Sequence, residues 1–174
     1  MIATTLTSTT FPRPLIFENA YENEPEGPIF WTHDTKSPAL WFFKMIEIPN
    51  LLVTDDDVAF RQVVCEGLSR RGFRVTEAGD GAEALDVMKR DEIHVALVDL
   101  HMPRLTGLDV IRCLSESPES PPCVLMSAKL DDMIRAEAKR MRAFDVLSKP
   151  VRLQHLTEVI GRILEVVYGW HPSR

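Results

Sequence analysis

The sequence predicts an α/β fold: a (βα)5 doubly wound sheet of five parallel strands, preceded by a mostly disordered N-terminal extension. Two observations support this prediction. From residue 48 onward, short apolar runs alternate with segments of helical periodicity. The runs are almost wholly apolar, as in parallel strands that helices cover on both faces of the sheet.

The five predicted strands are short, and four of them lead into a polar residue. This pattern is typical of a buried strand that ends in a loop. The predicted strands cover residues 51–53, 73–78, 95–98, 123–126 and 144–148.

The segments between the strands place apolar residues on one face of a helix. For the first helix we expect Gly72 near the C-terminal end, and for the second we expect Asp80 as the N-cap. The fourth helix begins near Asp131 or Asp132. The predicted apolar faces contain Phe60, Val63, Val64 and Leu68; Ala84, Leu85 and Met88; Leu108, Ile111 and Leu114; and Leu153, Leu156, Ile160, Ile163, Leu164 and Val167.

The chain divides near residue 45. Five prolines upstream of this point interrupt any regular element: Pro12, Pro14, Pro25, Pro28 and Pro38. We therefore expect a mostly disordered extension over residues 1–44, one domain over 45–170 and a short tail over 171–174. The sequence leaves open whether Met45 is the natural start.

Charge and composition exclude several functional classes. A net charge of −6 gives no electrostatic support for direct binding to DNA or to an anionic membrane. No apolar run is long enough to span a membrane, and no targeting segment is evident, so we expect a cytoplasmic protein. The three cysteines form no CxxC pair, and we expect all of them to be reduced core residues.

Polar residues gather where the predicted strands end. Asp55 and Asp56 follow the first strand, Asp99 ends the third, Ser127 ends the fourth and Lys149 ends the fifth. Because the carboxyl ends of parallel strands share one edge of a sheet, these side chains should converge there. The adjacent Asp57 is expected to cap a helix instead.

Clustered carboxylates raise each other's pKa unless a cation lies between them. Hard oxygen ligands in a compact acidic site suit Mg²⁺, which often bridges carboxylates and phosphate. An aspartate can also act as a nucleophile and form an aspartyl-phosphate. Lys149, Ser127 and Mg²⁺ would then stabilise the oxygens of the transferred phosphoryl group.

The motifs at these strand ends resemble the receiver domain of two-component response regulators, in particular the single-domain, chemotaxis-regulator-like type. The matching segments are residues 51–57, 99–103 with Gly107, 127–128 and 149–150. The resemblance covers about residues 48–168 and implies a flavodoxin-like fold.

The resemblance implies that Asp99 is the phosphoacceptor. Asp55, Asp56, Asp99 and the backbone carbonyl of His101 would hold Mg²⁺, and Ser127 would move toward the phosphoryl group. Lys149, before a cis Pro150, would pair with that group. The resemblance also implies that Ala128 leaves the pocket open and that His101 and Lys129 control the lifetime of the phosphoryl group.

One position departs from the family pattern. Receivers often carry Tyr or Phe three residues before the lysine, as a side chain that swings inward on activation, but here the residue is Val146. A β-branched side chain is too stiff and too short for that movement. Strand alternation places Phe144 on the same face as Val146. The route by which activation propagates is therefore open.

The resemblance implies a phosphorylation-dependent switch rather than an enzyme. A histidine kinase or phosphotransfer protein would phosphorylate Asp99, and the signal would pass to a downstream protein target. The sequence leaves open whether the chain forms a homodimer. One alternative is a Mg²⁺-dependent aspartyl-phosphate phosphatase or phosphotransferase. Such hydrolases need a second Asp two residues after the nucleophile, and the residue there is His101, which counts against this alternative. The other alternative is a receiver-like scaffold that is not phosphorylated.

Overall fold

The computed structural model describes residues 46–117 and 119–172. The predicted extension over residues 1–44 lies outside the described residues, as do the last two residues of the predicted tail. None of the helices that the structure describes has the length and apolar character required to cross a membrane.

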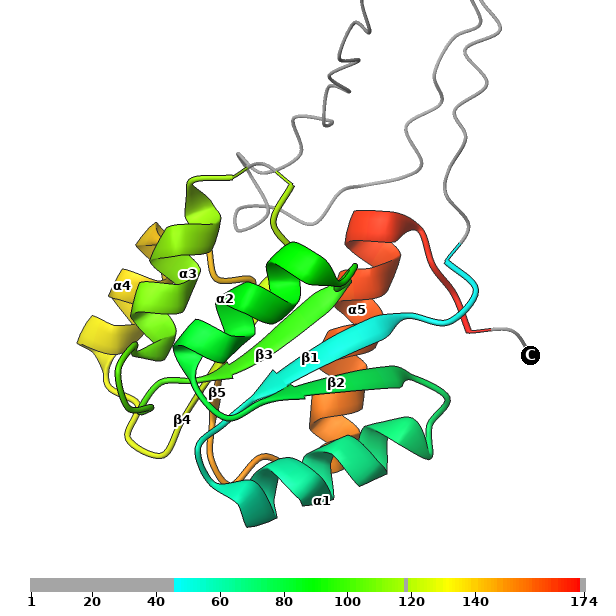
Figure 1. The fold of residues 1–174 in the computed structure, drawn as a ribbon, viewed down its shortest axis with the longest axis horizontal. Helices are drawn as coiled ribbons and strands as arrows, with labels where there is room; N and C mark the ends of the chain where they lie inside the picture. Colours follow the sequence, from blue (N-terminus) through cyan, green and yellow to red (C-terminus); the bar gives the residue numbers. More distant parts are fainter. Residues whose placement is uncertain (1–45, 118, 173–174) are drawn as a thin grey trace, which may run out of the picture. The chain divides into compact units, whose positions relative to one another are not determined.

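Strands and helices alternate strictly through the described residues (Figure 1). The strands are β1 (Asn50–Thr54), β2 (Arg74–Ala78), β3 (Val95–Asp99), β4 (Cys123–Ser127) and β5 (Asp145–Ser148). The helices are α1 (Val58–Ser69), α2 (Gly81–Arg90), α3 (Gly107–Ser115), α4 (Asp132–Arg140) and α5 (Leu153–Tyr168).

All the strand pairs are parallel, and the strand order is β2-β1-β3-β4-β5. The predicted (βα)5 fold is therefore confirmed. The order reverses direction between β1 and β3, which is where ligands bind in open sheets of this kind. The strand ends that carry Asp55 and Asp99 lie side by side at this point, because Thr54 pairs with Val98.

Strand alternation divides the core into two layers. The first core layer lies under α1 and α5 and receives Leu51 and Val53 from β1. The second core layer lies under α2, α3 and α4 and receives Leu52 from the same strand. Successive side chains of a strand point to opposite faces, so each strand with an apolar run contributes to both layers.

Carboxylates cap the starts of three helices. Asp57 accepts hydrogen bonds from the backbone N–H groups of Ala59 and Phe60, at 3.0 and 3.1 Å. Asp80 and Asp131 cap α2 and α4 in the same way. The predictions for Asp57 and Asp80 are confirmed, and so is the start of the fourth helix.

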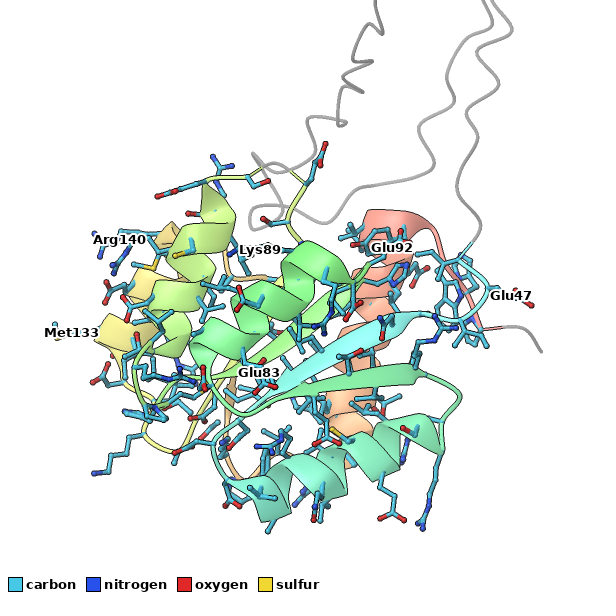
Figure 2. All side chains as sticks on the ribbon, viewed as in Figure 1. Glu47, Glu83, Lys89, Glu92, Met133 and Arg140 are labelled. Atoms are coloured by element: carbon cyan, nitrogen blue, oxygen red, sulfur yellow. The ribbon has the colours of Figure 1, made fainter. Side chains whose placement is uncertain are left out.

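Some predicted core positions are wrong. Val63 is 69% exposed, whereas Val64, Cys65, Gly67 and Leu68 form the buried face of α1. Each helical residue advances by about 100°, which places Val63 just beyond the buried arc, and Cys65 occupies the core instead. The side chains of the exposed helix faces project into solvent, as Met133 of α4 does (Figure 2).

The three free cysteines do not share one environment. Cys65 and Cys123 are buried, and burial raises the pKa of each thiol to about 12. Cys113 is exposed on α3, so the expectation of three core cysteines is wrong for this residue. The apolar face of α3 is formed by other residues, among them the buried Val110 and Ile111.

The end of α4 places an arginine in a left-handed conformation. Arg142 has φ 63°, its N–H donates to the carbonyl of Lys139, and the N–H of Ala143 donates to that of Ala138. This pairing is the Schellman motif, in which glycine is the usual residue at the left-handed position. Gly72, with φ 88°, occupies that position after α1.

We predict that Arg142→Gly raises the free energy of unfolding by about 0.5 to 1 kcal/mol, because relief of the left-handed strain exceeds the extra entropy of glycine in the unfolded chain. The matched change Gly72→Ala should lower it by about 1 kcal/mol. Urea unfolding measures both changes. A stabilising Gly72→Ala would contradict this account of the two helix ends.

Candidate functional site

The carboxylates predicted to converge do converge. Asp55, Asp56 and Asp99 each offer an oxygen, and these oxygens lie within 4.8 Å of one another. Asp55 is fully buried and Asp99 is 4% exposed, whereas Asp56 faces solvent. The cluster therefore combines two desolvated carboxylates with one that is accessible from outside.

Lys149 lies between the two buried carboxylates. Its Nζ is 2.5 Å from Oδ2 of Asp55 and 2.5 Å from Oδ1 of Asp99. The Lys149–Pro150 peptide bond is cis, as the resemblance implied. The lysine predicted from the end of the fifth strand thus joins the ends of β1 and β3 across the sheet edge.

Burial and pairing act in opposite directions on these groups. Burial raises the pKa of Asp55, and the hydrogen bond from Lys149 offsets that effect only in part, so the pKa lies above its usual value of 3.8. Burial lowers the pKa of Lys149, but its hydrogen bonds to Asp55 and Asp99 outweigh burial and the pKa is raised. Lys149 is therefore a cation, and it partly compensates the buried negative charge.

Backbone N–H groups bind the remaining oxygens of both carboxylates. Oδ1 of Asp55 accepts from the N–H of Asp57 at 3.0 Å, and Oδ2 of Asp99 accepts from the N–H of His101 at 2.8 Å. Both oxygens of each buried carboxylate thus have a donor. These contacts fix the carboxylate planes before any ligand arrives.

Ser127 is buried, and its hydroxyl is engaged within its own loop. It donates to the carbonyl of Lys129 at 2.7 Å and accepts from the N–H of Lys129 at 3.1 Å. Its backbone carbonyl accepts from the N–H of Lys149 at 2.8 Å, which ties β4 to the end of β5. Ala128, Lys129 and His101 are exposed at the rim of the site.

Val146 and Phe144 lie in different surroundings. Val146 is half-buried and packs against the second core layer, whereas Phe144 packs against the first. The expectation that both share one face is wrong, because Phe144 precedes β5 and strand alternation does not extend to it. Phe144 is therefore no substitute for an aromatic residue at position 146.

Sequence reasoning missed the contacts of two residues that border the site. The Lys149 ammonium lies 4.4 Å from the ring centroid of Phe60. Arg61 donates from a terminal guanidinium nitrogen to the carbonyl of Asp55 at 2.5 Å, and from Nε to Glu77 at 3.1 Å. Both residues lie on α1, where helical periodicity assigned Phe60 to the core alone.

Gly107 packs directly against the backbone of Asp99. A Cβ at this position would lie 2.4 Å from the carbonyl oxygen of Asp99 and 2.7 Å from Cδ1 of Leu125. The N–H of Gly107 also donates to the carbonyl of Leu100 at 3.0 Å. The start of α3 thus reaches the third strand only because this residue has no side chain.

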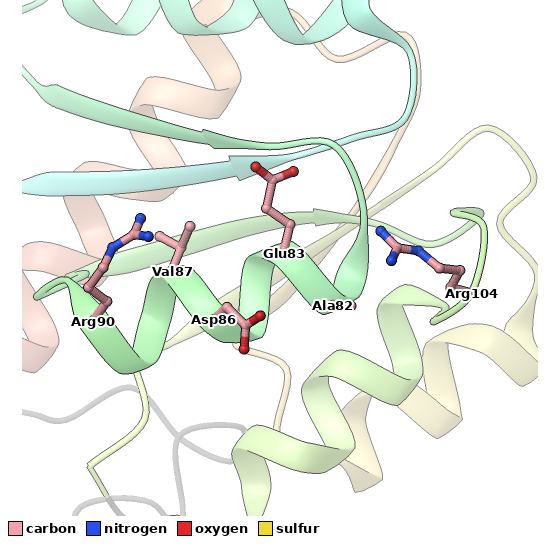
Figure 3. Close-up of a pocket in the computed structure, with 6 residues that line it drawn as sticks. All are labelled: Ala82, Glu83, Asp86, Val87, Arg90 and Arg104. Atoms are coloured by element: carbon pink, nitrogen blue, oxygen red, sulfur yellow. The ribbon is translucent and has the colours of Figure 1, made fainter.

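A separate surface hollow of about 310 Å³ runs along α2 (Figure 3). Its walls include Glu83 and Asp86 but also Arg90 and Arg104, so their charges cancel. Arg104, from the loop after β3, also pairs with Asp80. The hollow lacks the clustered charge of the carboxylate site, and we assign the chemistry to the sheet edge.

The raised pKa of Asp55 predicts a pH dependence of stability in the absence of metal. The folded state holds the Asp55 proton more tightly than the unfolded state, so this group lowers stability as pH rises from about 4 through its folded pKa. Asp55→Asn should therefore be the more stable protein at pH 7 in EDTA, and the difference should vanish near pH 3.5. Urea unfolding at several pH values measures it.

The control for this prediction is Asp86→Asn, which changes an exposed carboxylate on α2. Its stability should track that of the parent chain at every pH. A less stable Asp55→Asn protein at pH 7 would mean that the ion pair with Lys149 outweighs the burial of Asp55.

Comparison with known proteins identifies relatives of this arrangement. A family model, the response regulator receiver domain, matches residues 51–161. Response regulator MprA of Mycobacterium leprae (strain TN) is 35% identical over 114 residues, which cover 66% of this chain and 50% of that protein. Regulatory protein VirG of Rhizobium rhizogenes is 32% identical over 101 residues, or 58% of this chain and 42% of that protein. The chain thus spans about half the length of the curated relatives it matches.

Solved structures share the fold. The chemotaxis protein CheY4 of Vibrio cholerae aligns with a TM-score of 0.64 at 26% identity, over 67% of this chain and 99% of that one. A response regulator from Burkholderia pseudomallei, solved with a phosphorylated aspartic acid, calcium ion and citrate, aligns with a TM-score of 0.61 at 26% identity, over 68% of this chain and 70% of that one. With the match of the family model, these likenesses show that the chain belongs to the response regulator receiver domain family.

Proposed function

We propose that the chain is a phosphorylation-dependent switch of a two-component phosphorelay, with Asp99 as the phosphoacceptor. The observation that carries the proposal is the contact of Lys149 with Asp99 inside the three-carboxylate cluster. The donor would be a phosphohistidine of a histidine kinase or a phosphotransfer protein. The receiver family supplies a signalling domain, and in this proposal the only reaction of the chain is its own phosphorylation and dephosphorylation.

The transfer is a displacement at phosphorus. An oxygen of Asp99 forms a bond to the phosphorus while the P–N bond of the phosphohistidine breaks, and the imidazole leaves with the bonding electrons. The Lys149 ammonium, already 2.5 Å from Oδ1 of Asp99, follows the new negative charge onto a phosphoryl oxygen. The N–H of His101 holds the other oxygen of the acceptor and so orients it.

The carboxylate cluster fits a hard divalent cation. Three oxygens within 4.8 Å of one another, one of them on an exposed side chain, match the ligand preference of Mg²⁺. Asp55, Asp56, Asp99 and the backbone carbonyl of His101 would hold the ion. A bound Mg²⁺ would supply charge neutralisation for the incoming phosphoryl group.

Ser127 has a defined task in this proposal. Its hydroxyl donates to the carbonyl of Lys129, and that hydrogen bond has to break before the hydroxyl can reach the phosphoryl group. The movement would transmit phosphorylation to the loop before α4. Ala128 would leave the donor a path to Asp99, and the exposed His101 and Lys129 would control how readily water attacks the aspartyl-phosphate.

The signal is proposed to leave through protein contacts made by the domain over residues 45–170. A net charge of −6 does not favour direct contact of this chain with DNA. A downstream protein target, with or without homodimer formation, is the partner that we propose.

The central test is phosphorylation by a small donor. Incubation of the full chain with Mg²⁺ and acetyl phosphate should add one labile phosphoryl group, measured by intact mass. Asp99→Asn or excess EDTA should abolish the adduct, whereas Asp86→Asn should keep it. If the parent chain gains no adduct, or if Asp99→Asn still gains one, the proposal is wrong.

Val146→Ala should leave the rate of this phosphorylation nearly unchanged, because Val146 packs against the second core layer rather than against the carboxylates. The substitution should lower the free energy of unfolding by about 1 kcal/mol, since Val146 is only half-buried. Labelling time courses measure the phosphorylation rate, and urea unfolding measures the free energy of unfolding. A large loss of labelling would assign Val146 a direct part in the chemistry.

A further inference from the structure

The environment of Lys149 includes an aromatic ring as well as two carboxylates. Its Nζ lies 4.4 Å from the ring centroid of Phe60, inside the range of about 6 Å over which a cation is attracted to the face of a ring. The Lys149 side chain is only 17% exposed, so water screens this attraction weakly. Phe60 and the two carboxylates therefore share one ammonium.

The position of the Phe60 ring is set independently of the carboxylates. Its backbone N–H donates to Oδ1 of the N-cap Asp57 at 3.1 Å, which fixes the residue in the first turn of α1. The half-buried ring also packs against the first core layer. Neither anchor involves Asp99 or Lys149.

We propose that Phe60 is a positioning residue for phosphorylation, holding the Lys149 ammonium toward Asp99 while the carboxylate partners of the lysine are engaged elsewhere. This inference rests on the proposed function. It gives a task to a ring that sequence periodicity assigned to the core alone.

The need for such a residue follows from the chemistry at the two carboxylates. Lys149 pairs with both carboxylates. In the proposed reaction, Asp55 would share its oxygens with a cation, and an oxygen of Asp99 would become bonded to phosphorus. Both carboxylate partners of Lys149 would therefore be altered during the reaction. The face of Phe60 takes part in neither change, and so it remains as a partner for the ammonium throughout.

The test compares rings of nearly constant size. The full chain is prepared with phenylalanine analogues at position 60 that carry one, two or three ring fluorines, which weaken the negative face of the ring progressively. The rate of Asp99 phosphorylation by acetyl phosphate in Mg²⁺ should fall with each fluorine, to about fivefold below the parent rate at three fluorines. Phe60→Tyr, which keeps an electron-rich ring, should label at nearly the parent rate, and Phe60→Leu should be slowed about fivefold.

A matched control separates this effect from packing. Phe73 also packs against the first core layer, next to Trp170, and the same fluorinated analogues at position 73 should leave the labelling rate unchanged. A second readout needs no phosphodonor: in NMR spectra, the ring current of Phe60 should shift the Lys149 methylene protons upfield, and Phe60→Leu should remove this shift.

The outcomes are distinct. If every chain with a fluorinated ring at position 60 is phosphorylated at the parent rate, the positioning role is overturned and the proposed function stays intact. Slow labelling of Phe60→Leu without any fluorine dependence assigns Phe60 to packing and also overturns it. A parent chain that is not phosphorylated overturns the proposed function, and the positioning role with it.

Discussion

The ammonium of Lys149 is the contact on which the acidic edge of the sheet depends. It lies 2.5 Å from an oxygen of each of two buried carboxylates, one at the end of β1 and the other at the end of β3. Removal of this ammonium would leave two buried carboxylates without their cation, which is strongly destabilising. The edge nevertheless keeps an excess of negative charge, because three carboxylates face one ammonium. This excess of negative charge supports the divalent cation site that we propose here.

The sheet topology determines where these charged side chains lie. Parallel strands bring their carboxyl ends to one edge, and the order β2-β1-β3-β4-β5 sets β1 and β3 side by side. The backbone then fixes the details. The N–H of Leu100 donates to the carbonyl of Met126 at 2.8 Å, and Gly107 allows α3 to begin against the carbonyl of Asp99. Asp99 is therefore held between two strands and the start of a helix.

The parts of the site that sequence could predict are those set by strand ends. Apolar runs located the strands of the central sheet, and the residues after them, Asp55, Asp99 and Lys149, lie where parallel pairing requires. The cap residues Asp57 and Asp80 followed from local hydrogen bonding in the same way. In each case the period or the cap depends on a few neighbouring residues, so the information is local.

The features that were missed depend on side-chain direction in three dimensions. The contact of Phe60 with Lys149 joins residues 60 and 149, and no periodicity links them. The hydroxyl of Ser127 could bond to its own loop or point into the site, and the sequence is the same in both cases. The buried Thr54 hydroxyl, which lacks a hydrogen-bond partner within the described part of the chain, is also invisible in an apolar strand pattern.

The unequal exposure of the three cysteines has a practical consequence. The thiols of Cys65 and Cys123 are buried with pKa values of about 12, so at neutral pH they contain almost no reactive thiolate. Cys113 is exposed on α3, the helix that begins just after the loop that follows β3. A maleimide dye would therefore attach at one known place in the native sequence. A fluorescent reporter could therefore be attached at Cys113 without adding or removing any cysteine.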